Sequence, residues 1–193
     1  MGERGEPVDE ELVRRVQKGD KKAFDVLVLK YQHRIVQLIN RYIRDQHEAL
    51  DIAQETFIKA YRALPTFRGE SAFYTWIYRI AINTAKNHIA TRSRRPADDD
   101  IDIETAEQFE SAIGLRDQET PEGLLLSDEL AQVIQVALDE LPDELRTAVS
   151  LRELDGLSYD EIADVMNCPV GTVRSRIFRA REAIDKKLQT LLG

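Results

Sequence analysis

A stretch near the C-terminus combines residue types that can read DNA. At 100° per residue, one side of a helix over this stretch is apolar and carries Val173, Ile177, Ala180, Ile184 and Leu188. The opposite side carries Arg174, Ser175, Phe178 and Arg179, with Arg176 and Arg181 on the flanks. Guanidinium groups pair with guanine edges or phosphates, a hydroxyl bonds to either, and a phenyl ring touches a thymine methyl group. A helix that enters a major groove explains both the basic stripe and its Phe, whereas a solvated amphipathic helix leaves the Phe unexplained.

A second candidate site is an aromatic segment. Five of the chain's 13 aromatic residues lie between residues 67 and 79. Helical spacing places Phe73, Ile77, Ile80 and Thr84 on one face with Trp76 at its edge, which indicates core. The other side carries Tyr74, Tyr78, Arg79, Asn83 and Lys86. Rings interleaved with cations suit single-stranded nucleic acid, and a loop over 67–69 before a helix capped by Ser71 suits an unstacked base. Aromatic residues at helical spacing are also typical of a plain core.

A third candidate is the helical stretch at residues 51–60. Asp51, Gln54, Glu55 and Lys59 follow the spacing i, i+3, i+4 and i+8, which places them on one polar face beside Phe57. By itself this pattern indicates a solvated helix surface.

Helices position all three candidates. In the N-terminal part, hydrophobic periodicity predicts helices over 10–16, 22–43, 46–63 and 71–91. In the C-terminal part, Ser127 can cap a helix whose apolar face is Leu130, Val133, Ile134, Ala137, Leu138 and Leu141. Pro142 opens the next helix, with Leu145, Ala148, Val149 and Leu154 on its apolar face and a stop at Asp155 and Gly156. Strand-type alternation is lacking, so we expect an all-α fold.

The DNA-reading candidate belongs to a predicted helix-turn-helix. Ser158 and Glu161 form a capping box ahead of the apolar residues Ile162, Ala163, Val165 and Met166. Residues 167–169 end this short helix, and a new one begins near Gly171. Cys168 lies in the turn, where we interpret it as a small buried residue rather than a redox or metal-binding thiol.

Charge divides the chain into three parts. Residues 1–92 carry a net charge of +4, residues 93–125 carry −7 and residues 126–193 carry −5. The acidic middle also contains Pro96, Gly114, Pro121 and Gly123, which interrupt long helices. We therefore expect two small helical domains, 1–92 and 126–193, joined by an acidic linker over 93–125.

Composition excludes several classes of protein. The single cysteine and three scattered histidines give no disulfide framework, metal site or catalytic pairing, and no glycine-rich loop could hold a phosphate. We therefore expect no cofactor and no catalytic residues. The chain has no apolar run of membrane-spanning length and no signal peptide, which predicts a cytoplasmic location. A net charge of −8 argues against binding nucleic acid by bulk electrostatics.

Five stretches carry a resemblance to a known family. They are GDKKAF at 19–24, DIAQETF at 51–57, YRAL at 61–64, the segment 67–86, and the segment that runs from LRELDGLSY at 151–159 to REAID at 181–185. Together they resemble the bacterial RNA polymerase sigma factors of the extracytoplasmic-function group, in particular sigma-E and its alginate-regulating relatives. The stretches cover both predicted domains, whereas the acidic linker and the first residues match only loosely.

The resemblance implies partners and residue roles. Core RNA polymerase would bind through the clamp coiled coil of its largest subunit and through its flap, and the residues implied at the clamp are Asp51, Gln54, Glu55 and Phe57. The melted −10 element would be held as single-stranded DNA by Phe67, Tyr74, Trp76, Arg79 and Asn83. The duplex −35 element would be read by Arg174, Ser175, Arg176, Phe178 and Arg179, with Arg152 in support. It further implies envelope-stress control by a membrane-tethered anti-sigma factor, which can hold this cytoplasmic protein at the inner membrane.

Three other functions compete with this interpretation. A free-standing helix-turn-helix regulator leaves the aromatic segment and the polar face at 51–60 without a role. An enzyme acting on nucleic acid lacks a plausible site. A helical interaction protein that binds no DNA leaves Phe178 unexplained on its basic face.

Overall fold

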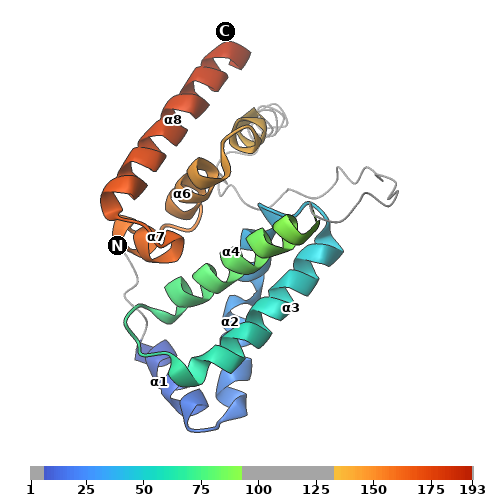
Figure 1. The fold of residues 1–193 in the computed structure, drawn as a ribbon, viewed down its shortest axis with the longest axis vertical. Helices are drawn as coiled ribbons and strands as arrows, with labels where there is room; N and C mark the ends of the chain where they lie inside the picture. Colours follow the sequence, from blue (N-terminus) through green and yellow to red (C-terminus); the bar gives the residue numbers. More distant parts are fainter. Residues whose placement is uncertain (1–6, 93–132, 193) are drawn as a thin grey trace, which may run out of the picture. The chain divides into compact units, whose positions relative to one another are not determined.

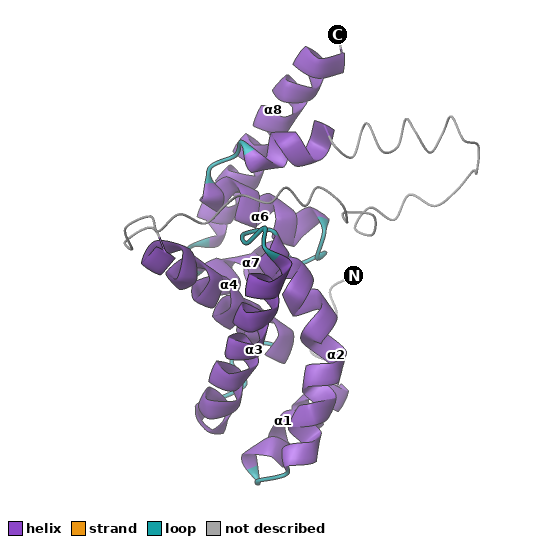
Figure 2. Ribbon diagram, turned by 90° about the vertical axis from the view of Figure 1, so that its right-hand side faces the viewer, coloured by secondary structure: helices purple, strands orange, loops and turns teal. Residues whose placement is uncertain are grey.

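The computed structural model describes residues 7–92 and 133–192. The chain divides into two compact units, Met1–Ile101 and Asp102–Gly193. The described residues form helices joined by loops and turns, without a strand, which confirms the all-α class (Figure 2). Ser127, Leu130 and the acidic segment 93–125 lie outside the described residues. None of the described helices is long and apolar enough to cross a membrane.

The first unit is a helical bundle. Its elements are α1 (Pro7–Gln17), α2 (Lys21–Asn40), α3 (Gln46–Ala63), the short 3₁₀ helix η1 (Leu64–Thr66) and α4 (Phe73–Arg92). All four predicted helices are present, with ends that differ by up to three residues. Helix α2 packs against α1, α3 and α4, while α3 packs along α4 (Figure 1). Each helix of this unit therefore packs against at least two other elements.

Local side-chain chemistry starts α2 and α3. Asp20 accepts hydrogen bonds from the backbone N–H groups of Lys22 and Ala23, and Asp45 accepts one from Glu48 N–H at 2.9 Å. Helix α4 starts differently from the prediction. It begins at Phe73, so Ser71 lies in the loop ahead of the helix and not at its cap position.

The second unit packs three labelled helices and a preceding turn of helix. Residues 133–139 are helical, followed by α6 (Asp143–Glu153), α7 (Tyr159–Met166) and α8 (Val170–Leu192). Helix α8 packs against α6 and α7. A cluster of apolar side chains fills the space between these elements: Leu138, Leu141, Leu145, Val149, Ala180 and Ile184.

The helix-turn-helix is confirmed by its caps. Ser158 Oγ accepts from Glu161 N–H at 3.3 Å, and the Glu161 carboxylate accepts from Ser158 N–H at 2.7 Å. Asn167 then ends α7 in the left-handed region, at φ 49°. Helix α8 begins at Val170, slightly earlier than predicted. Leu154 was wrongly assigned to the apolar face of α6, because the helix ends at Glu153 and the following turn leaves Leu154 exposed.

Removing the capping hydroxyl should loosen the second unit. We expect Ser158→Ala to lower its free energy of unfolding by about 1 kcal/mol, because the change leaves Glu161 N–H in the first turn of α7 without its capping acceptor. Denaturant unfolding followed by far-UV circular dichroism measures the change. Ser175→Ala is the matched control, because Ser175 is exposed and its hydroxyl donates only to Thr172 O within α8. Equal loss in both variants would contradict the capping role.

Candidate nucleic-acid interfaces

The first half of α8 presents the predicted outer face. Arg174, Ser175 and Arg179 are exposed, and Phe178 exposes 63% of its surface. The inward side is buried at Val173, Ile177 and Ala180 and half-buried further along at Ile184 and Leu188. We call Arg174, Ser175, Phe178 and Arg179 the α8 outer face. The sequence pattern therefore placed both sides of this helix correctly.

The flanking cations of α8 are engaged in ion pairs. Arg176 pairs with Glu144 of α6 and also donates to Cys168 Sγ at 3.3 Å. Arg181 pairs with Glu153 at 2.5 Å, which raises the pKa of that guanidinium, and Lys187 pairs with Glu140 at 2.7 Å. The Arg176 side chain is only 18% exposed, so it lies apart from the outer face. Cys168 is half-buried rather than buried as predicted, and its sulfur accepts the hydrogen bond from Arg176.

Arg152 lies beside the outer face and not within it. It is half-buried, and its guanidinium donates to Leu157 O at 2.8 Å across the turn before α7. The same guanidinium lies over the Tyr159 ring, 5.1 Å from its centroid. Arg174 lies over this ring too, at 5.9 Å. Two of the predicted DNA-contacting arginines thus meet at one tyrosine that the sequence analysis did not single out.

The aromatic segment divides between core and surface. Trp76 is buried at 8% exposure and packs against Phe67, with 4.8 Å between ring centroids and a tilt of 40° between the rings. Tyr78 is buried at 2%, so its predicted position on the outer side of α4 is wrong. The reason is that α1, α2 and α3 all pack against α4, which leaves only a narrow strip of the helix open to solvent.

That narrow strip forms the second candidate interface. Along α4, the spacing of Trp76, Arg79, Asn83 and Lys86 places them on one side, and we call them the α4 strip. Phe67 stacks over its first turn, Asn83 is exposed, and Arg79 and Lys86 are half-buried. Tyr74 is separated from this strip, since helical geometry turns it by about 140° from Arg79 and its ring meets Tyr78 at 6.4 Å. Tyr74 therefore joins the other side of the helix.

The loop that carries Phe67 is anchored by a residue far away in sequence. Gln17, the last residue of α1, donates from Nε2 to Leu64 O at 3.1 Å and to Phe67 O at 2.8 Å. These bonds hold η1 and the start of the loop on the end of α1. An exposed Gln at a helix end carries no sequence signal for this role, so Gln17 was missed.

The third candidate surface lies on α3. Asp51, Gln54 and Glu55 are exposed as predicted, and Glu55 pairs with Lys59 at 2.8 Å. Phe57 is buried at 8% exposure, so it supports this surface from behind. Ile58 is 45% exposed and shares the side of Asp51 and Glu55. We call Asp51, Gln54, Glu55 and Ile58 the α3 outer face.

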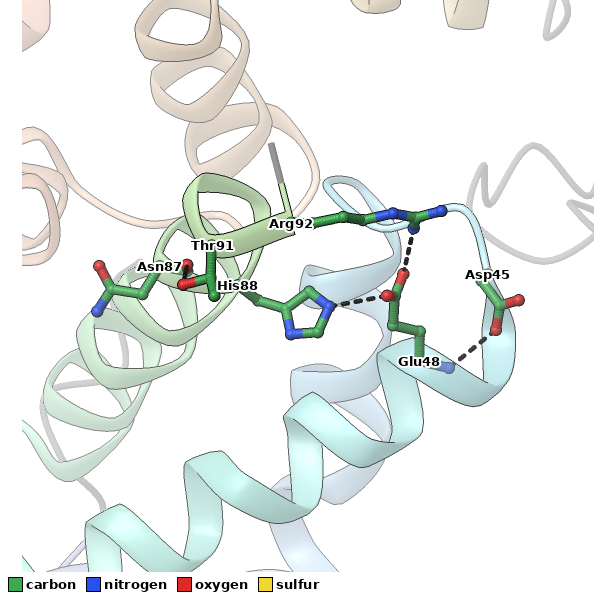
Figure 3. A network of polar contacts seen from close by, with 6 residues as sticks. All are labelled: Asp45, Glu48, Asn87, His88, Thr91 and Arg92. Atoms are coloured by element: carbon green, nitrogen blue, oxygen red, sulfur yellow. Dashed lines mark hydrogen bonds and ion pairs between the residues drawn. The ribbon is translucent and has the colours of Figure 1, made fainter. Parts of the chain in front are cut away.

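A polar network fixes the ends of α3 and α4 to each other (Figure 3). Glu48, in the first turn of α3, receives His88 Nε2 at 2.8 Å and the Arg92 guanidinium at 3.0 Å. Asp45 caps the same turn through Glu48 N–H. This network fixes the position of α3, which carries the α3 outer face, relative to α4, which carries the α4 strip.

The cap gives the first unit an acid-sensitive component. The Asp45 carboxylate accepts a hydrogen bond from Glu48 N–H, and this bond keeps the pKa of Asp45 below its usual value of 3.8. A lowered folded pKa stabilises the unit above the unfolded pKa, and the effect is lost as pH falls through the folded value. We expect the unfolding midpoints of wild type and Asp45→Asn to differ most above the unfolded pKa and to converge as the pH falls through the lowered pKa of Asp45. Trp76 fluorescence measures this unit alone, since the chain has one Trp. A pH-independent difference would contradict the assignment.

Comparison with known proteins places both units in one family. The family profile described as Sigma-70 region 2 matches residues 27–95, and the profile described as Sigma-70, region 4 matches residues 131–184. The "RNA polymerase sigma-H factor" of Pseudomonas aeruginosa is 64% identical over 184 residues, which cover 95% of each chain. The "ECF RNA polymerase sigma-E factor" of Escherichia coli K12 is 58% identical over 184 residues, covering 95% of this chain and 96% of that one.

A solved structure shares the fold. The sigma factor RpoE from Bartonella quintana, crystallised with the anti-sigma factor NepR, aligns with 87% of this chain and 98% of its own at a TM-score of 0.65 and 22% identity. The identities to sigma-H and sigma-E confirm the resemblance that the sequence motifs indicated. The chain belongs to the extracytoplasmic-function (ECF) group of the sigma-70 family, whose members bind core RNA polymerase and direct promoter-specific transcription initiation.

Proposed function

We propose that this sigma factor divides promoter recognition between its two units. The α8 outer face reads the duplex −35 element, Phe67 with the α4 strip holds the melted −10 element, and the α3 outer face binds the clamp of core RNA polymerase. The observation that carries the proposal is Phe178, which is 63% exposed among Arg174, Ser175 and Arg179 on a helix-turn-helix. A large exposed ring among cationic and hydroxyl side chains on a helix-turn-helix can contact thymine methyl groups while its neighbours bind phosphates and base edges.

The α8 outer face suits a major groove by its position on the helix. Recognition helices contact base edges mainly with their N-terminal residues, and the outer face occupies the first ten residues of α8. Beyond it, Glu182 and Asp185 are exposed and acidic. Arg176 is held by Glu144, so we assign it to positioning the turn of the helix-turn-helix rather than to DNA contact. Arg152 keeps its supporting role, through Leu157 O and Tyr159.

The −10 assignment rests on the two packed rings of Phe67 and Trp76 at the start of α4. Phe67 covers Trp76, and the strip continues with Arg79, Asn83 and Lys86. An aromatic residue on an anchored loop next to amide and cationic groups provides both a stacking surface and donors for an extruded base. Trp76 contributes as the buried support of Phe67. Tyr74 lies on another side of the helix, where its ring meets Tyr78, so the proposed site does not include it.

Control by a partner follows from the same surfaces. The Bartonella RpoE relative was crystallised with an anti-sigma factor. We infer that a membrane-tethered anti-sigma factor covers the polymerase-binding surfaces of this chain until envelope stress releases it, and that the chain acts in the cytoplasm. In this scheme the polymerase supplies all the chemistry, and the chain supplies contacts only.

Run-off transcription with purified core polymerase tests the proposal. The chain is added or omitted on an envelope-stress-type promoter, and the same DNA is mixed with the chain alone in a gel-shift assay. With a net charge of −8, the chain should bind DNA poorly until polymerase positions both units. Transcription that depends on the chain, with little shift by the chain alone, supports the proposal. A strong shift without transcription would favour a free-standing regulator.

A further inference from the structure

We propose that Tyr159 positions Arg174 for −35 recognition, as the middle member of a relay that begins at Arg152. This inference rests on the proposed −35 function of the α8 outer face. The geometry behind it is the meeting of both guanidinium groups over one ring, at 5.1 Å for Arg152 and 5.9 Å for Arg174.

The inner end of the relay is fixed. Arg152 is half-buried on α6, and its Nη1 donates to Leu157 O at 2.8 Å. Tyr159 is the first residue of α7, directly after the capping residue Ser158, whose two reciprocal bonds with Glu161 fix the backbone there. The Tyr159 ring therefore packs against the Arg152 guanidinium, which the hydrogen bond to Leu157 O holds in place. The capping box fixes the backbone next to Tyr159.

The outer end of the relay is the exposed one. Arg176, Arg181 and Lys187 are each restrained by a glutamate. Within the described residues, no carboxylate lies within ion-pair distance of Arg174, and its guanidinium contacts the Tyr159 ring. A cation–π contact needs no N–H···O hydrogen bond, so it can order Arg174 while its N–H donors stay available for a base edge.

The functional consequence is preorganisation. An unrestrained Arg must lose its rotamer freedom when it binds a base edge, which weakens binding by about two- to tenfold for one such side chain. A carboxylate partner would also order Arg174, but it would compete with the guanine acceptors. The Tyr159 ring orders the Arg174 side chain without competing with guanine for its N–H donors. Tyr159 thus affects how well the −35 base pairs are distinguished, without itself contacting a base.

The test measures −35 discrimination by the holoenzyme. Core polymerase saturated with Tyr159→Leu, Tyr159→Phe, Arg174→Ala or the Leu/Ala double variant is titrated with promoter DNA, either intact or with a scrambled −35 element. The ratio of the two affinities is the readout. We expect Tyr159→Leu to lower this ratio about three- to tenfold, Tyr159→Phe to keep it, and Tyr159→Leu to have less than about a twofold effect when Arg174 is already Ala.

Salt dependence separates positioning from charge. Tyr159→Leu leaves every cation in place, so the slope of log affinity against log salt should stay unchanged. The inference is overturned if Tyr159→Phe is as damaging as Tyr159→Leu, since the hydroxyl would then be responsible. An undiminished effect of Tyr159→Leu beside Arg174→Ala would overturn it equally. If Arg174→Ala alone leaves the ratio unchanged, the proposed −35 function fails, and this single variant distinguishes that failure from the failure of the relay.

Discussion

Arg174→Ala or Arg179→Ala should each weaken holoenzyme binding to an intact −35 element by about 10- to 100-fold. The estimate follows from the 1–3 kcal/mol that a well-placed Arg contributes to base discrimination. Both side chains are exposed, and no ion pair with either is recorded within the described residues, so neither change should disturb folding. Competition binding of holoenzyme to intact and scrambled −35 DNA measures the loss, and the affinity for core polymerase should remain at its wild-type value.

Lys186→Ala is the matched control for these variants. Lys186 is exposed on the same side of α8 as Arg179, about 10 Å further along the helix. Lys186 lies beyond the N-terminal residues of α8 that enter a groove. Its loss should therefore lower the affinity of the holoenzyme for intact and scrambled −35 DNA equally and only slightly. If Arg174→Ala instead abolished binding to core polymerase, the assignment of α8 to DNA would be wrong.

The second unit could be predicted well because its signals are local. The capping box at Ser158 depends on residues three apart, and the two sides of α8 follow from helical periodicity alone. When a long amphipathic helix is packed on one side only, the periodicity of its apolar residues predicts which side chains are buried. Leu154 departed from prediction only because the helix ended one residue earlier.

The first unit was harder to predict because α4 is packed on more than one side. A single-face pattern assumes one buried side, yet α1, α2 and α3 all contact this helix. Tyr78 consequently became a core residue although it lies off the face of Phe73 and Ile77. Gln17 shows a second limit, since its bonds to Leu64 O and Phe67 O join positions about 50 apart in sequence. Such long-range partners leave no periodicity to detect.

Phe57→Ala should disrupt the first unit by unfolding it rather than by removing a polymerase contact. Because Phe57 is buried at 8% exposure, its truncation should cost about 3–5 kcal/mol of unfolding free energy. For a domain of this size that corresponds to a fall in melting temperature of about 12–40 °C, followed by Trp76 fluorescence. Holoenzyme formation at 37 °C should be lost with it.

Ile58→Ala is the counterpart that separates folding from binding. Ile58 is the next residue along α3 and is 45% exposed on the α3 outer face, so its truncation should leave the melting temperature within a few degrees of wild type. We expect its affinity for core polymerase to fall about three- to tenfold, as expected for an apolar side chain that becomes buried on binding. Both variants are assayed against core polymerase at a temperature where Trp76 fluorescence shows that they are folded. Near-normal binding by folded Phe57→Ala, with weakened binding by Ile58→Ala, assigns the contact to the exposed residue, because only that side chain can reach a partner without unfolding the helix bundle. The reverse result would mean that Phe57 leaves the core to meet the polymerase.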